Sequence, residues 1–424
     1  MNLRLLPPED FLQARLMLPL SKSMSARALI INTLTPGADP LERVAACDDT
    51  DAMRHALADL SQTEVNIGAA GTTMRFLTAF YSCRPGIEVT LDGSERMRRR
   101  PIGVLVDALR SLGADIEYAG EEGFPPLHIR GRELKGGDLT LDASVSSQFI
   151  SALLMIAPVT ANGLTLRLEG EIVSRPYILM TLKMMADAGI ECELYRDTAT
   201  VKPGVYRKSG QPVEIEGDWS AAAVWYQITA ISGGVVTTDN LVKDSCQGDR
   251  VLADIYSRMG VDTEWCGEEG GTDLCANPDA DARADLDFSE CPDLAQCVTV
   301  TCAMLGYPFR FTGLQTLAIK ETDRIEALRR ELAKIGVNIT VEGPGTISWD
   351  GRRMPVNELP VFDTYDDHRM ALCLAPVSLF MPGIIIRDAG VVSKSYPEFW
   401  EHLRAAGFTL LDGDAPLPEP DTEA

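Results

Sequence analysis

The chain has 424 residues, of which 45% are hydrophobic and 24% are charged, and its formal net charge at pH 7 is −23. This length exceeds what one hydrophobic core usually supports, so we expect a globular protein of two domains. The excess of acidic residues disfavours binding to nucleic acid or to an acidic membrane surface, but it remains compatible with a local basic pocket for a small anion.

The ten cysteines include no C-x-x-C pair, and several of them, such as Cys297, Cys302 and Cys373, lie in apolar helical runs. Buried thiols of this kind behave as small hydrophobic groups. No group of His, Cys and carboxylate residues has the spacing of a metal site. The first residues lack the apolar stretch of a signal peptide, and no apolar segment is long enough to span a bilayer. We therefore expect a cytoplasmic protein that holds no metal.

Six times along the chain, an extended apolar run ends in a small or acidic residue that opens an apolar, helix-like run. The residues at these turns are Ser23, Gly71, Ser146, Asp218, Asp293 and Asp367, and from Gly71 onward they follow one another after 72 to 75 residues. A recurrence this regular predicts repeated strand–turn–helix units. Because helix N-termini attract anions, the units also provide several anion sites that can be directed at one place.

Amphipathic helices followed by alternating strands recur between the turns, so we expect mixed sheets covered by helices in an α/β (α+β) fold. A loop-like stretch at 208–215 indicates a boundary near the middle of the chain. We expect one domain over residues 21–215 and a second over 216–424, which residues 1–20 complete if that segment pairs with the second half. The acidic, Pro-rich residues 413–424 are expected to form a frayed tail.

The first two turns carry groups suited to an anion. Lys22 and Ser23 open a helix, and Arg27 lies one turn further on, so the three side chains can surround one anion. At the second turn, Gly71 lets backbone N–H groups approach a ligand closely. This turn matches neither the P-loop nor the dinucleotide-binding glycine pattern.

Further groups of polar side chains follow along the chain. In the first half they are Arg96, Arg98, Arg99 and Arg100; Ser146, Ser147 and Gln148; and Ser174, Arg175 and Tyr177. In the second half they are Asp293 with Gln296; Lys320, Glu321 and Arg324; Asp366, Asp367, His368 and Arg369; and Lys394. Each group alone is explained equally well by a helix cap, a turn or a surface ion pair, the first of these for Asp293 as part of a capping box. Their joint placement at equivalent turns favours a binding site.

These residues, in this order, resemble the motifs of the 5-enolpyruvylshikimate-3-phosphate synthase family of enolpyruvyl transferases. The similar segments run from about Leu18 to Pro397 and include LPLSKSMSARAL, GTTMR, RMRRRPIG, SVSSQF, SRPY, IKETDR and DHRM. The resemblance implies two similar domains, each of three βαβαββ-type units around a pseudo-threefold axis, with the active site in the cleft between them. It implies transfer of the enolpyruvyl group of phosphoenolpyruvate to the 5-hydroxyl of shikimate 3-phosphate, in the shikimate pathway to chorismate and aromatic amino acids, by a monomer that needs no cofactor.

The resemblance also assigns site residues position by position. Shikimate 3-phosphate would be held by Lys22, Ser23, Arg27, Ser146, Ser147, Gln148, Ser174, Asp293, Thr316 and Lys320, with Tyr177 beside them. Phosphoenolpyruvate would be held by Lys22, Gly71, Arg100, Gln148, Arg324, Arg369 and Lys394. The expected catalytic residues are Asp293 as the base toward the 5-hydroxyl, Glu321 as the proton carrier at C3 of phosphoenolpyruvate, and Lys22 at the leaving phosphate.

Four residues depart from the family's pattern. Ala69 stands where the family usually has Asn, Phe76 where it has Pro, and Leu20 where it has Gly. Thr316 replaces an Asn that contacts the shikimate group, and its hydroxyl can still form a hydrogen bond. Because Ala69 and Phe76 flank Gly71, the sequence does not predict the affinity for phosphoenolpyruvate or for the family inhibitor glyphosate.

Two other interpretations are open. The sister enolpyruvyl transferase that acts on UDP-N-acetylglucosamine carries a reactive Cys in the loop corresponding to 94–100, which contains none here. A catalytically inactive scaffold would have no need of Asp293, Glu321 and Lys22 together with the basic residues around them.

Overall fold

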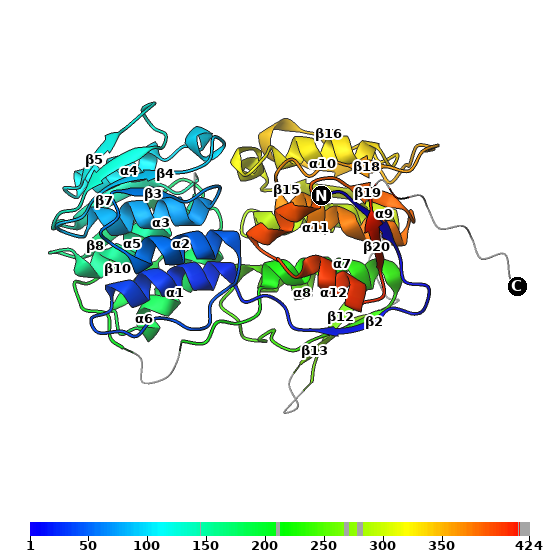
Figure 1. Cartoon of the computed structure of the whole chain (residues 1–424), viewed down its shortest axis with the longest axis horizontal. Helices are drawn as coiled ribbons and strands as arrows, with labels where there is room; N and C mark the ends of the chain where they lie inside the picture. The colour runs from blue at the N-terminus through cyan, green and yellow to red at the C-terminus, as the bar shows by residue number, and fades with distance from the viewer. Residues whose placement is uncertain (145, 209–212, 267–270, 278–282, 414, 416–424) are drawn as a thin grey trace, which may run out of the picture. The chain divides into compact units, whose positions relative to one another are not determined.

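The computed structural model describes residues 1–144, 146–208, 213–266, 271–277, 283–413 and 415. These residues fall into two compact units (Figure 1): unit 1 comprises Met1–Leu18, Trp219–Lys243 and Val251–Ala424, and unit 2 comprises Pro19–Asp218 and Asp244–Arg250. The domain boundaries expected from the sequence stay a prediction. The division differs from them in placing Pro19, Leu20 and residues 216–218 with unit 2, and also Asp244–Arg250, where Tyr177 Oη donates a hydrogen bond to Asp249 Oδ1 (3.0 Å). Of the expected tail, 414 and 416–424 lie outside the described residues.

Unit 2 contains two four-stranded sheets within its described part. Their strands, in spatial order, are β3 (Glu64–Asn66), β4 (Glu88–Asp92), β6 (Leu127–Arg130) and β5 (Asp115–Tyr118), and β7 (Gly137–Asp142), β8 (Leu164–Glu169), β10 (Thr198–Val201) and β9 (Cys192–Tyr195). The α-helices are α1 (Lys22–Leu34), α2 (Asp48–Ala58), α3 (Gly71–Ser82), α4 (Gly103–Ser111), α5 (Ser147–Ile156) and α6 (Arg175–Asp187). A third pairing in this unit is reduced to an isolated antiparallel bridge between Leu20 and Gly217.

Unit 1 contains three four-stranded sheets within its described part. Their strands, in spatial order, are β12 (Val261–Trp265), β13 (Thr272–Ala276), β11 (Val235–Thr238) and β2 (Gln13–Leu16); β14 (Ala284–Asp287), β15 (Phe309–Thr312), β17 (Ile347–Trp349) and β16 (Thr340–Val341); and β18 (Val361–Phe362), β19 (Ile384–Ile386), β1 (Leu3–Leu6) and β20 (Thr409–Asp412). The α-helices are α7 (Trp219–Ser232), α8 (Leu252–Ser257), α9 (Ala295–Leu305), α10 (Arg324–Ala333), α11 (His368–Leu374) and α12 (Phe399–Ala405).

One strand pattern recurs in all of these sheets. A parallel pair is extended by two antiparallel strands, as in β3–β4–β6–β5 and in β14–β15–β17–β16. In four of the sheets a helix connects the two parallel strands, namely α3, α5, α9 and α11, and the turns at Gly71, Ser146, Asp293 and Asp367 fall between the first strand and that helix. The expectations of repeated strand–turn–helix units and of mixed sheets covered by helices are therefore confirmed. Ligands of α/β sheets usually bind at such carboxyl ends of parallel strands.

The N-terminal segment completes two sheets of unit 1. β1 lies between β19 and β20, antiparallel to both, and β2 pairs parallel with β11. The sequence left this pairing open, because strands so short carry no information about a partner more than 200 residues away.

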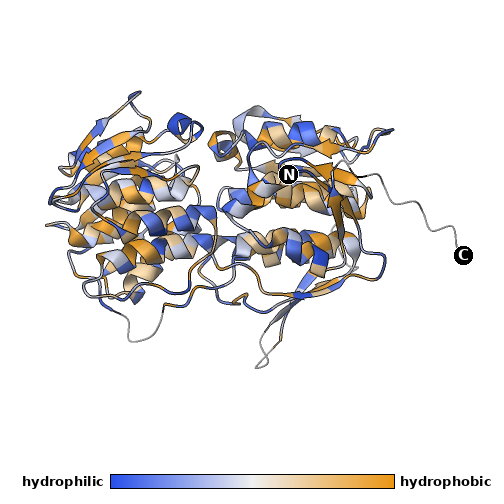
Figure 2. Ribbon diagram, viewed as in Figure 1, coloured by the Kyte–Doolittle hydropathy of each residue, from blue (hydrophilic) through white to orange (hydrophobic). Residues whose placement is uncertain are grey.

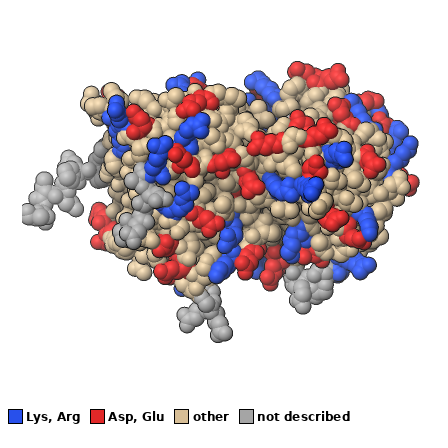
Figure 3. Space-filling model, turned by 180° about the vertical axis from the view of Figure 1, so that it is seen from behind, with Lys and Arg blue, Asp and Glu red and all other residues tan. Residues whose placement is uncertain are grey.

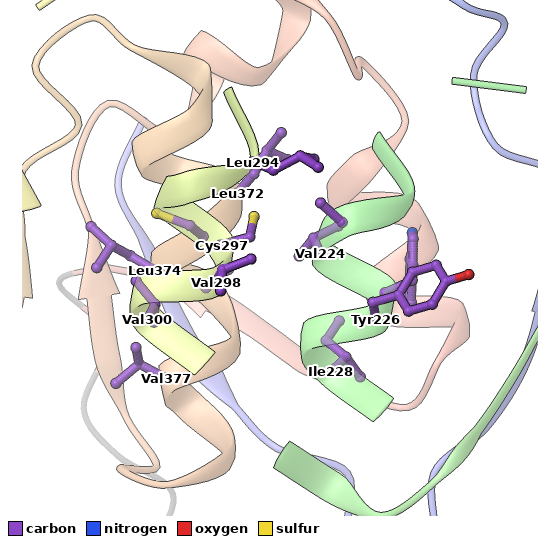
Figure 4. Packing of buried hydrophobic residues seen from close by; sticks show 14 of the residues in the cluster. Val224, Tyr226, Ile228, Leu294, Cys297, Val298, Val300, Leu372, Leu374 and Val377 are labelled. Atoms are coloured by element: carbon purple, nitrogen blue, oxygen red, sulfur yellow. The ribbon is translucent and has the colours of Figure 1, made fainter. Parts of the chain in front are cut away.

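The core of unit 1 is built around three helices, α7, α9 and α11. Figure 4 shows side chains of α7, such as Val224, facing those of α9, such as Val298, with Leu372 of α11 beside them. All three residues are at most 5% exposed. Helices that are apolar on nearly every side belong in a protein interior, and hydrophobic residues likewise gather on the strands of both units (Figure 2).

Charged side chains of both signs are interspersed on the face shown in Figure 3. Several cations that the sequence singled out are instead buried, with exposed fractions of 3% for Arg27, 7% for Arg100, 1% for Arg324 and 6% for Lys394. Within the described residues, no helix is both long and apolar enough to cross a membrane.

Candidate active site

Unit 1 has a buried ionic cluster at the start of α10, centred on Arg324. The guanidinium donates to Asp293 Oδ1 (2.7 Å), to Glu321 Oε2 (3.0 Å) and, through Nε, to Asp367 Oδ2 (2.7 Å). Burial alone would lower the pKa of Arg324, but the charges of the three carboxylates raise it above its ordinary value. A buried cation costs free energy unless it is paired and hydrogen-bonded, and here the pairing fixes the three carboxylates around one point.

Three further cations surround these carboxylates. Lys320 Nζ lies 3.3 Å from Asp293 Oδ1, and Lys394 Nζ lies 2.7 Å from Glu321 Oε1. Arg369 Nη1 donates to the backbone oxygen of Asp293 (3.0 Å), and its Nη2 lies 3.5 Å from Asp293 Oδ2. Among the described residues of this cluster, four cations thus face three carboxylates, which suits the cluster to accept an anion.

The environment of Asp293 keeps its carboxyl group ionised. Burial would raise the pKa of Asp293, but the charges of Lys320, Arg369 and Arg324 hold it well below its usual range. The capping-box interpretation of Asp293 is wrong, because the side chain contacts these cations rather than a helix N-terminus. α9 has Leu294 as its N-cap residue without a side-chain cap, and Gln296 Nε2 lies 3.1 Å from the sulfur of Met370.

Side chains that cap helices explain the positions of the other turn residues. Asp367 caps α11 by accepting from Arg369 N (2.9 Å), which directs Arg369 toward Asp293. Ser146 caps α5 by accepting from Gln148 N (3.3 Å). At α1 the cap is Ser21, which accepts from Met24 N (3.4 Å), so Ser23 lies inside the helix rather than at its cap.

Lys22 stands at the first position of α1 in unit 2. Its backbone N–H donates to Asp218 Oδ2 (3.0 Å), so the Asp218 turn contacts the start of α1. Its Nζ pairs with Asp49 Oδ2 (2.9 Å), and Asp49 is 6% exposed. No sequence motif singled out Asp49, which is one of several acidic residues in the first turn of α2.

Arg27 is surrounded by neutral oxygens. It donates to Thr181 Oγ1 (2.7 Å), Ser23 O (2.8 Å) and Ser151 Oγ (3.1 Å), and its guanidinium carbon lies 5.4 Å from the centre of the Phe76 ring. Burial lowers the pKa of Arg27 to about 10. Phe76, which departs from the family's pattern, therefore contacts a predicted binding residue directly.

Gly71 and Arg100 lie in close contact in unit 2. Gly71 opens α3, and Arg100 packs against it so closely that no side chain fits between them. Among the described residues, Arg100 Nε has no hydrogen-bond partner. A guanidinium beside a helix N-terminus is electrostatically unfavourable unless an anion joins them. Of the other arginines in that cluster, Arg98 pairs with Asp92 and Arg99 with Glu95, both exposed.

The remaining predicted residues of unit 2 lie near these helix starts. Gln148 Nε2 donates to Thr72 Oγ1 (3.1 Å) and so joins α5 to α3. Ser147 is 9% exposed, and Ser174 precedes α6 in the left-handed conformation (φ 56°). Tyr177 O accepts from Arg27 Nη2 (3.3 Å).

Thr316 has an unused hydrogen-bonding group. It lies in a 3₁₀ helix (Gln315–Ile319) that leads to Lys320, and it is 9% exposed. Within the described part of the chain its Oγ1 has no partner. A buried hydroxyl without a partner is costly, so this position is suited to receive a hydrogen bond from a ligand.

Comparisons with known proteins agree on one family. A family profile described as EPSP synthase (3-phosphoshikimate 1-carboxyvinyltransferase) matches residues 58–403. The 3-phosphoshikimate 1-carboxyvinyltransferase of Bacteroides fragilis (strain YCH46) is 50% identical over 412 residues, covering 97% of this chain and 99% of that protein. That of Shewanella halifaxensis is 36% identical over 438 residues, covering 96% and 99%. The structure of EPSP synthase from Acinetobacter baumannii superposes with a TM-score of 0.74 at 20% identity, covering 97% of this chain and all of the other.

Proposed function

The chain belongs to the EPSP synthase (3-phosphoshikimate 1-carboxyvinyltransferase) family, and on this premise we propose that the clusters around Arg324 and around Gly71 and Arg100 bind and activate its two substrates. The enzyme transfers the enolpyruvyl group of phosphoenolpyruvate to the 5-hydroxyl of shikimate 3-phosphate and releases phosphate. This reaction belongs to the shikimate pathway, which leads to chorismate and the aromatic amino acids.

The observation that carries the proposal is the Arg324 cluster. It combines carboxylates able to transfer protons with cations able to hold an anion, and it does so within a few ångströms. A reaction between two highly charged substrates needs both, because the cations neutralise and orient the substrates while the carboxylates move protons. Pure structural ion pairing would not require an excess of cations over carboxylates.

We assign each of the two substrates to its own set of residues. We assign shikimate 3-phosphate to Lys22, Ser23, Arg27, Ser146, Ser147, Gln148, Ser174, Asp293, Thr316 and Lys320. We assign phosphoenolpyruvate to Lys22, Gly71, Arg100, Gln148, Arg324, Arg369 and Lys394.

The chemistry proceeds by addition and elimination. The 5-hydroxyl oxygen bonds to C2 of phosphoenolpyruvate as its proton passes to Asp293, and C3 gains a proton that Glu321 carries to it from solvent. Phosphate then leaves from C2 as C3 returns a proton to Glu321, and Lys22 stabilises the phosphate that departs. The second step restores the carbon–carbon double bond, and the protons balance when the proton that Asp293 took from the 5-hydroxyl passes through solvent to the departing phosphate.

Substrate binding adjusts the basicity of Asp293. In the cluster as it stands, Lys320, Arg369 and Arg324 hold the pKa of Asp293 too low for an effective base. Substrate anions that bind Arg324, Arg369 and Lys320 attract the same cations, which weakens their pairing with Asp293. The pKa of the carboxyl group then rises toward the range of a base only when both substrates are present.

The location, the oligomeric state and the partners belong to the same proposal. We propose a cytoplasmic monomer that acts on small-molecule substrates without a cofactor and without binding nucleic acid or membrane. The cysteines support a reducing compartment, since those described are free thiols and many are buried. The net charge of −23 supports the absence of polyanionic partners.

A phosphate-release assay tests the function. Purified enzyme is mixed with phosphoenolpyruvate and either shikimate 3-phosphate or UDP-N-acetylglucosamine, and inorganic phosphate is measured. Release with shikimate 3-phosphate alone is expected. Release with the UDP-sugar instead would indicate the sister transferase, and release with neither would indicate an inactive scaffold.

A further inference from the structure

The segment that leads into α11 has a strained backbone. Tyr365 and Asp366 both adopt the left-handed conformation, with φ of 54° and 55°. Residues with a Cβ rarely adopt this conformation, and two in succession persist only where surrounding contacts impose them. The segment ends at Asp367 and Arg369, so its shape decides where these two side chains lie.

Glu331 provides those contacts. Its carboxylate is completely buried and accepts hydrogen bonds from Tyr365 Oη (2.6 Å at Oε1), from the backbone N–H of Asp363 (3.0 Å at Oε2) and from Lys334 Nζ (2.7 Å at Oε2). Lys334 Nζ also donates to Val361 O (2.8 Å) and to Asp363 Oδ2 (3.1 Å). Burial and the bond to Glu331 raise the pKa of Tyr365, so Tyr365 remains a hydrogen-bond donor.

The same helix holds both ends of the segment. Arg324 and Glu331 are the first and eighth residues of α10, about two helical turns apart and therefore on one face. Arg324 Nε donates a hydrogen bond to Asp367 at the end of the segment. Glu331 accepts hydrogen bonds from Asp363 N–H and Tyr365 Oη at its start. α10 lies beside β18, from which the segment emerges (Figure 1).

We propose that Glu331 is a positioning residue, which holds residues 363–366, with Tyr365 and Asp366 in the left-handed conformation, and thereby sets Arg369 for phosphoenolpyruvate. Glu331 itself touches no substrate. This inference rests on the proposed assignment of Arg369 to phosphoenolpyruvate. Binding of shikimate 3-phosphate, assigned mostly to residues of unit 2, is expected to depend little on Glu331.

Two variants of the full-length enzyme test the inference. Glu331→Gln keeps the side-chain shape but removes the negative charge that pairs with Lys334 and replaces one acceptor oxygen with an amide N–H₂, and Tyr365→Phe removes only one hydrogen bond. For Glu331→Gln we expect KM for phosphoenolpyruvate to rise about tenfold, with KM for shikimate 3-phosphate within about twofold of wild type. Tyr365→Phe should show the same split more weakly, and the double variant should add little to Glu331→Gln, because the two residues act through one contact.

The matched control is Glu326→Gln on the same helix. Glu326 pairs with Arg329 (2.7 Å) and Arg330 (2.6 Å) at the surface, whereas the hydrogen bonds to residues 363–366 that the structure describes on this helix come from Glu331 and Lys334. Its KM values and those of the wild type should agree. If Glu331→Gln does not fold, Tyr365→Phe still carries the test.

Hydrogen exchange separates this inference from the proposed function. The amides of residues 363–369 should exchange faster in Glu331→Gln than in wild type or Glu326→Gln, whether or not the enzyme releases phosphate. If the wild type releases no phosphate, the proposed function is overturned. The effect of Glu331 on residues 363–369 is then still tested by hydrogen exchange. Unchanged exchange at 363–369, an unchanged KM for phosphoenolpyruvate, or an equal rise in both KM values would overturn the role of Glu331.

Discussion

Gly71 and Arg100 are packed so closely that a methyl group on Gly71 would lie 2.6 Å from Arg100 Nη1 and 2.9 Å from its Cζ. Contacts of this length do not occur between real side chains, so any residue other than glycine displaces the guanidinium. Arg100 is 7% exposed and packed among buried residues, which leaves it little room to move. A glycine is therefore needed at this turn to leave space for Arg100, as well as to begin α3.

Replacing Gly71 with Ala is expected to weaken binding of phosphoenolpyruvate. Displacement of Arg100 should raise KM for phosphoenolpyruvate by about tenfold or more, since a charge-assisted contact is lost, while KM for shikimate 3-phosphate changes little. Steady-state kinetics with each substrate varied in turn measures the difference. Gly204→Ala is a matched control in the same unit, because its added Cβ would make only ordinary contacts, with Ile190 Cδ1 at 3.4 Å and Lys202 O at 4.0 Å. Equal KM values in Gly71→Ala and wild type would contradict the assignment.

Replacing Thr316 with Val tests whether its hydroxyl contacts shikimate 3-phosphate. Valine has nearly the same shape, and the hydroxyl has no protein partner within the described residues, so the melting temperature should stay the same or rise. KM for shikimate 3-phosphate should rise by about 3- to 10-fold, the loss of one hydrogen bond. Thr316→Ser keeps the hydroxyl and should resemble wild type. A Thr316→Val enzyme with an unchanged KM would show that the contact of the family's Asn has been lost here.

Removing the charge of Arg324 should destabilise unit 1 strongly. Arg324→Met leaves the buried carboxylate of Asp367 without its cation and removes one partner each from Asp293 and Glu321, and removal of one partner from a buried pair typically costs about 3–5 kcal/mol. Chemical denaturation at pH 7 measures this loss. Arg329→Met, which breaks a surface pair with Glu326, should change the free energy of unfolding by less than about 1 kcal/mol. Similar losses in the two variants would contradict the picture of a buried cluster.

Asp293 should make the stability of the wild type sensitive to acid. Its pKa in the folded protein is depressed, so the unfolded chain binds more protons than the folded one below the ordinary aspartate pKa of about 3.9. The contribution of Asp293 to stability is thus complete above about pH 5 and is lost as the pH falls toward the folded value. Denaturation midpoints from pH 6 to pH 3 should fall less steeply for Asp293→Asn than for wild type. If the midpoints of the two proteins fall equally steeply with pH, the neighbouring cations do not lower the pKa of Asp293.

Much of this architecture follows from the sequence. The spacing of Gly71, Ser146, Asp293 and Asp367 reflects a repeated unit, because each residue stands between the first parallel strand of a sheet and the helix that follows it. Many of the candidate site residues could also be selected from the sequence, because polar and charged side chains recur at these turns.

Other features depend on contacts between distant segments. Asp293 looked like a helix cap because local rules favour aspartate there, but Arg324, 31 residues later, takes its carboxylate instead. Asp49 and Glu331 lie in acidic or amphipathic helices whose local sequence gives no sign of their partners Lys22 and Tyr365. Which arginine of the basic cluster is buried also required the structure, since Arg98 and Arg100 differ only in their surroundings.

The release of inorganic phosphate by wild type and Asp293→Asn is the decisive test of Asp293 as the general base of the reaction. With phosphoenolpyruvate and shikimate 3-phosphate, the wild type should release phosphate, and the variant should turn over at least about 100-fold more slowly, as expected for loss of a general base. The variant should still bind shikimate 3-phosphate with an affinity within about threefold of wild type, since most of its proposed ligands are untouched. Equal rates of phosphate release in the two enzymes would contradict the account.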